Sequence, residues 1–70
     1  MHNPEDFRGR KSIIIKYFKQ KGVSGGTISE FCALSMIPIT VVCTFISEDM
    51  PEHNELCNEK IKAIREFFGE

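Results

Sequence analysis

Residues 27–46, TISEFCALSMIPITVVCTFI, decide the fold of this chain. Their apolar, small and capping residues are spaced as in two short helices joined by a tight turn. This is the outline of a helix-turn-helix, a unit whose second helix can lie in the DNA major groove and read bases with its outward side chains. The outline predicts an all-α domain of three or four helices that contains a helix-turn-helix.

The first of these two helices has a clear start signal. Thr27 and Glu30 have the spacing of a capping box, in which each side chain accepts a hydrogen bond from a free backbone N–H. The glycine-rich run before them, residues 22–26, is expected to be a loop. Pro38 is expected to end the first helix and to open the second, because proline fits a first helical turn but not a helix interior.

The second element, residues 38–47, is rich in β-branched residues that suit a strand equally well. As a strand it would be only half amphipathic, and the fold would then be α+β. As a helix it turns Val42, Phe45 and Ile46 inward. The helix leaves five residues nearer the surface: Ile39, Thr40, Cys43, Thr44 and Ser47. We favour the helix.

Two longer helices are expected on either side of this pair. Residues 7–21 place lysines and arginines opposite an apolar stripe of Phe7, Ile13, Ile14, Tyr17 and Phe18. Residues 52–68 carry a stripe spaced by three and four, formed by Leu56, Cys57, Ile61, Ile64, Phe67 and Phe68. Gly22 and Gly69 are expected to stop these helices.

Length and composition indicate a single soluble domain over residues 1–70. Hydrophobic residues make up 41% and charged residues 27%, which is typical of a globular protein with a packed core. The longest uncharged run, residues 31–47, is shorter than a membrane helix, so no membrane partner is expected. The polar start of the chain lacks the apolar stretch of a signal peptide. We therefore expect a cytoplasmic protein whose three cysteines are reduced thiols in apolar positions.

The charges are segregated along the chain. The net charge is -1, which argues against binding nucleic acid by charge alone. The first 21 residues carry six Lys and Arg against two acidic residues, and the remainder carries three against eight. The basic segment is expected to face phosphates. The alternative is that both segments are simply solvated helix faces.

The helix-turn-helix stretch resembles the amino-terminal DNA-binding domains of the lactose-repressor family. Their pattern is of the type T-I-x-x-V-A-x-x-A-G-V-S-x-x-T-V-S-x-x-L. It is matched here by Thr27, Ile28, Phe31, Cys32, Ile37, Val42 and Phe45. The preceding RKSIIIKYFKQKG looks more like the winged-helix amino termini of the repressor, open-reading-frame and kinase family. Three departures are visible: Met36 replaces the turn glycine, Pro38 replaces the usual capping residue, and no Arg, Lys, Asn or Gln lies between Phe31 and Ser47.

The resemblance implies a small DNA-binding protein of transcriptional regulation. Its implied groove contacts are Pro38, Ile39, Thr40 and Thr44, with Ile39 or Val41 touching thymine methyl groups. The expected phosphate contacts are Thr27, Ser47, Arg10, Lys11 and Lys16. Because one short recognition element reads few base pairs, a homodimer on duplex DNA is expected.

Plain burial is the alternative for Ile39, Val41 and Val42. If these side chains are exposed instead, they predict a surface that binds protein. The second hypothesis is therefore an interaction module of phage or mobile-element origin. Such a module would bind a host protein through an apolar surface over residues 36–46.

Catalytic and metal sites find little support in the sequence. The only histidines are His2 and His53, and no nucleophile, base and acid are suggestively spaced. His53 and Cys57 lie four apart, which suits a metal, but zinc normally takes four ligands, and Cys32 and Cys43 would have to leave the core to complete the set. We therefore expect a protein that is not an enzyme and that holds no metal or cofactor.

Overall fold

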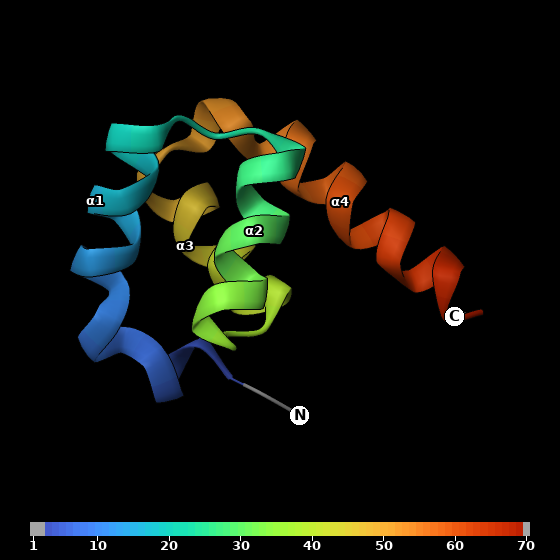
Figure 1. Ribbon diagram of the computed structural model, residues 1–70, viewed down its shortest axis with the longest axis horizontal. Helices are drawn as coiled ribbons and strands as arrows, with labels where there is room; N and C mark the ends of the chain where they lie inside the picture. Colours follow the sequence, from blue (N-terminus) through green and yellow to red (C-terminus); the bar gives the residue numbers. More distant parts are fainter. Residues whose placement is uncertain (1–2, 70) are drawn as a thin grey trace.

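Helix α3 (Ile39–Asp49) lies at the centre of the fold, and α1 (Lys11–Lys21), α2 (Gly25–Ser35) and α4 (Asn54–Phe67) pack around it (Figure 1). Two 3-10 helices, η1 (Pro4–Arg10) and η2 (Pro51–His53), precede α1 and α4. The computed structural model describes residues 3–69, and within them there is no strand. The prediction of an all-α domain of three or four helices is confirmed, with four α-helices present, and the α+β alternative is wrong.

The β-branched residues of α3 are helical because the rest of the chain buries them. Five α3 side chains are buried in the core: Val41, Val42, Cys43, Phe45 and Ile46. The prediction that Cys43 lies near the surface is wrong, since its side chain is only 1% exposed. A helix covered from several sides buries a wider arc than one amphipathic stripe, and this burial outweighs the helix propensity of the residues.

Helix α2 begins earlier than predicted. Its N-cap is Ser24, whose hydroxyl accepts a hydrogen bond from the backbone N–H of Thr27 at 3.1 Å. Thr27 therefore lies inside the first turn, and its hydroxyl is 2.8 Å from that of Ser24. The expected capping box was misplaced by three residues, because Gly25 and Gly26 join the helix instead of the loop.

The turn between α2 and α3 depends on Met36. This residue has left-handed backbone angles, φ 63° and ψ 17°, and its N–H donates to the Cys32 carbonyl at 3.0 Å. It is the one described non-glycine residue with positive φ, and its side chain is 85% exposed. Ile37 then enters the core and Pro38 caps α3. Met36 thus adopts the conformation for which glycine is the usual residue.

The expected helix over residues 7–21 is divided at Arg10, where η1 ends and α1 begins. Helix α1 buries Ile14, Ile15 and Phe18, whereas Ile13 is 69% exposed. The prediction that Ile13 belongs to the buried stripe is therefore wrong. The reason is geometric: α1 packs on α3 with the face centred on Ile14 and Phe18, and Ile13 lies one residue beyond that face.

Helix α4 begins at Asn54, after η2, and follows its predicted apolar stripe only in its first half. Cys57 is buried and Ile61 and Ile64 are half-buried, but Phe67 is 83% exposed and Phe68 is also exposed. Placing these two aromatic residues in the buried stripe was wrong. Figure 1 shows the last turns of α4 leading away from the other helices, so no described residue covers them.

No helix among residues 3–69 is long and apolar enough to cross a membrane. The three cysteines are free thiols, with Cys43 and Cys57 buried and Cys32 half-buried.

We predict that Met36→Gly stabilises the fold. Glycine reaches the left-handed region without the Cβ penalty, and the exposed Met36 side chain contributes little packing. The expected gain in the free energy of unfolding is about 0.5–1 kcal/mol, measured by urea denaturation. The matched control is Ala63→Gly at an exposed position inside α4, which is expected to lose about 1 kcal/mol. A loss in both variants would contradict the role given to the turn.

Candidate nucleic-acid interface

One side of α3 remains uncovered by the other helices. Thr40, Thr44, Ser47 and Glu48 lie along it, at successive steps of four, three and one residue, and each is exposed or half-buried. The Thr44 hydroxyl donates to the Thr40 carbonyl at 2.7 Å, so this donor is satisfied within the helix. The uncovered side of α3 therefore presents short hydroxyl side chains and one carboxylate.

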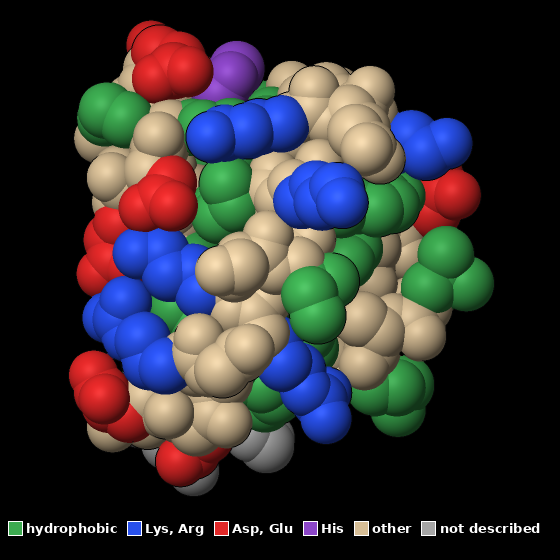
Figure 2. All heavy atoms as spheres, turned by 90° about the vertical axis from the view of Figure 1, so that its left-hand side faces the viewer, with side chains coloured by type: hydrophobic (Ala, Val, Ile, Leu, Met, Phe, Trp, Pro, Cys, Tyr) green, Lys and Arg blue, Asp and Glu red, His purple; other side chains and the backbone are tan. Residues whose placement is uncertain are grey.

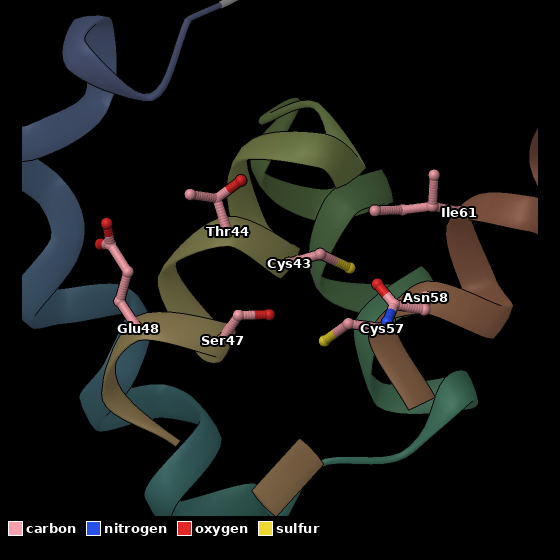
Figure 3. Close-up of a pocket in the computed structure, with 7 residues that line it drawn as sticks. All are labelled: Cys43, Thr44, Ser47, Glu48, Cys57, Asn58 and Ile61. Carbon is pink, nitrogen blue, oxygen red and sulfur yellow. The ribbon is translucent and has the colours of Figure 1, made fainter. Parts of the chain in front are cut away.

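Beside this face, a cavity of about 320 Å³ opens between α3 and α4. Figure 3 shows its lining as side chains from both helices: Cys43, Thr44, Ser47, Glu48, Cys57, Asn58 and Ile61. Hydroxyl, amide and thiol groups here lie beside an apolar floor. This cavity combines a few polar groups with apolar surface, as binding sites for small groups do.

Glu48, at the end of this face, joins α3 to η1 and α1. Its carboxylate accepts two hydrogen bonds from the Arg8 guanidinium at 2.8 and 3.1 Å, and one from the Lys11 ammonium at 2.9 Å. Lys11 also pairs with Asp49 at 3.0 Å. The hydrogen bonds from Arg8 and Lys11 lower the pKa of Glu48 to about 2, and the same contacts raise the pKa of both cations.

These ion pairs affect which of the predicted phosphate contacts have an unpaired positive charge. Lys11 is paired with Glu48 and Asp49. Arg10 and Lys16, in contrast, are exposed and make no ion pair within residues 3–69. Lys16 borders a second depression together with Lys19 and Asp49. Figure 2 shows Lys and Arg side chains spread over the α1 side of the molecule, with acidic side chains gathered along one edge.

The structure places the predicted groove contacts on and around the start of α3. Thr40 is exposed, Thr44 lines the cavity, and Pro38 and Ile39 are half-buried at the N-terminal end. Ser47, a predicted phosphate contact, also lines the cavity. Val41 is fully buried in the core, so the prediction that it reaches thymine methyl groups is wrong. Thr27 lies on α2 against Ser24 and belongs to a different element from the α3 residues.

Sequence reasoning missed four residues that shape this site: Cys43, Glu48, Cys57 and Asn58. Cys43 and Cys57 are both buried, yet they also line the cavity. Glu48 and Asn58 had no distinguishing signal, because the pairing of Glu48 with Arg8 joins residues 40 positions apart. No three His, Cys, Asp or Glu side chains gather as a metal site within the described part of the chain.

Comparisons of the chain with protein families, with characterised proteins and with solved structures found no match.

We predict that the Glu48 ion pairs give the fold an acid-labile contribution to stability. A carboxylate whose pKa is lowered from 4.5 to about 2 stabilises the folded state fully above pH 4.5, and this contribution is lost as the pH falls toward 2. Glu48→Gln is expected to reduce the free energy of unfolding at pH 7 and to flatten its decline between pH 4.5 and 2. Urea denaturation at several pH values measures both.

The control is Glu59→Gln, which alters an exposed α4 carboxylate without an ion pair among the described residues. It should leave the pH profile close to that of the parent protein. An unchanged profile for Glu48→Gln would show that the Arg8 and Lys11 contacts add no stability.

Proposed function

We propose that this domain binds duplex DNA through the uncovered side of α3 and acts in transcriptional regulation. The turn between α2 and α3 carries the proposal. Three residues connect the two helices, Met36 supplies the left-handed angle, and the next helix begins directly after Pro38. A short turn of this kind, with the second helix uncovered along one side, is the arrangement by which a helix-turn-helix enters the major groove.

The chemistry of the α3 face suggests how such an interface would work. Thr40 and Thr44 offer hydroxyl and methyl groups, and Ile39 is half-buried beside them. None of these side chains makes the bidentate contacts to guanine or adenine that Arg, Lys, Asn and Gln make. Affinity would therefore come mainly from phosphate contacts of exposed cations such as Arg10 and Lys16, with modest base preference.

Two copies on DNA suit this interface better than one. A single α3 face presents few base-reading groups, and two recognition helices related by twofold symmetry would double the contacts. The dimer is part of the proposal and needs a measurement of its own, such as sedimentation with and without DNA.

The test is a fluorescence-anisotropy titration of duplex DNA at 50 and 200 mM salt. If about three phosphates are contacted, affinity should fall roughly 40-fold between these two salt concentrations. Lys16→Glu is expected to weaken binding and to lower by about one the number of phosphate contacts that the salt dependence indicates. Thr40→Ala should weaken binding a few-fold and leave the salt dependence unchanged.

Lys16 replaces Lys11 as the informative position, because Lys11→Glu would place a third carboxylate beside Glu48 and Asp49 and destabilise the fold. The matched control is Lys62→Glu, an equal change of charge at an exposed position on α4. Equal losses for Lys16→Glu and Lys62→Glu would indicate only a response to net charge. Absence of binding at 50 mM salt would end the proposal.

A protein partner is the second candidate, and one observation favours it. Leu34 and Met36 are both exposed at the end of α2, and Ile13 is exposed on α1. The surface expected over residues 36–46 is not available as such, since most of α3 is buried. An exposed set of large apolar side chains is typical of a protein contact. Binding that is insensitive to salt and lost in Leu34→Ser would favour this candidate.

A further inference from the structure

Two thiols from different helices meet in the cavity between α3 and α4. Cys43 on α3 and Cys57 on α4 are each 1% exposed, yet both line the cavity of about 320 Å³. In Figure 3 their sulfur atoms are directed into the space between the two helices. The two thiols therefore face the same space from the two helices that enclose it.

The third thiol is placed differently. Cys32 lies on α2, is half-buried, and is not among the residues that line this cavity. It is near enough to Cys43 to add to the raised pKa of that thiol, and Lys60 on α4 opposes the rise in the pKa of both Cys32 and Cys43. Of the three thiols, Cys43 and Cys57 are the two that line this cavity.

We propose that Cys43 and Cys57 are an oxidation site, at which hydrogen peroxide converts the two thiols into a disulfide that joins α3 to α4. In the first step, one thiol sulfur attacks the peroxide, the O–O bond breaks, and a sulfenic acid and one water form. In the second step, the other thiol attacks the sulfenic sulfur, the S–S bond forms, and a second water leaves. The two thiols together lose two electrons and two protons, and the peroxide is reduced to two waters.

The surroundings set the rate of this reaction. Burial, together with the neighbouring Cys57 thiol, raises the pKa of Cys43 to about 12, so Cys43 stays protonated at neutral pH. Because the thiolate is the nucleophile, the reaction should be slow at pH 7 and faster at pH 9. The cavity opens to solvent and has room for a molecule as small as hydrogen peroxide, since one water occupies about 30 Å³.

A disulfide at this place would close the short loop that contains η2. Cross-linking such a loop restricts the unfolded chain more than the folded one, so the oxidised domain should melt at a higher temperature. For a domain of this size, the expected rise in Tm is roughly 10 °C.

The experiment treats the full chain with hydrogen peroxide at pH 7 and pH 9, blocks remaining thiols with N-ethylmaleimide, and identifies the products by mass spectrometry. The expected product is a monomer about 2 Da lighter than the reduced chain carrying the same single blocking group, which is attached at Cys32. Its peptide map should contain a linked peptide with Cys43 and Cys57. It should form faster at pH 9 and show the higher Tm, and dithiothreitol should reverse both changes.

Cys32→Ser is the matched variant and should form the same bond at the same rate. Cys57→Ala should form none, and circular dichroism establishes that it is folded. If Cys57→Ala fails to fold, the peptide map of Cys32→Ser still decides the pairing. A linked peptide that contains Cys32, a dimer joined between chains, higher oxides without a cross-link, or unchanged mass at both pH values would each overturn the proposal.

Discussion

The burial of α3 is the constraint on which the rest of the structure depends. In a domain of 70 residues, one helix supplies five of the buried side chains, and every other described helix contacts it. A small domain buries a modest share of its surface, so it cannot leave its central helix half covered without losing most of its core. The sequence of α3 meets this demand with branched and aromatic residues on most of its circumference. The part of α3 that stays in contact with solvent is a narrow line of threonine, serine and glutamate side chains.

Burial on this scale also decides where the charges of the domain lie. No charged or polar side chain is buried among the described residues, and the ion pairs that join different helices gather around the end of α3. There Glu48 holds Arg8 and Lys11, and both cations lie over the ring of Phe45, at 5.3 and 5.8 Å from its centroid. One carboxylate thus joins η1, α1 and α3 where the aromatic core reaches the surface. The basic first segment is therefore partly a structural element, not only a surface for phosphates.

The sequence predicted the elements better than their boundaries and faces. All four predicted α-helices are present, and Pro38 marked the junction of α2 and α3 correctly, although periodicity alone left residues 38–47 open between helix and strand. The faces were harder to predict, because a single stripe describes a helix that packs on one neighbour. The exposure of Ile13 and the burial of Cys43 were mispredicted for this reason. The exposure of Phe67 was mispredicted because α4 extends beyond the helices against which it packs. The cavity and the Glu48 ion pairs join residues distant in the chain, and nothing in local spacing encodes such pairings.

The same packing limits what the α3 face can recognise. A helix that buries most of its circumference has few outward positions, and here they hold short side chains that cannot reach deep into a groove. Met36, at 85% exposed, keeps a left-handed turn without glycine, so the angle between α2 and α3 is retained at some cost in stability. A conformation that is unfavourable for the residue holding it persists only when its surroundings enforce it, and here Ile37 and Pro38 do so by entering the core and capping α3. Both helices on either side of this turn therefore contribute to the core, and any ligand of α3 must fit a narrow face of short side chains.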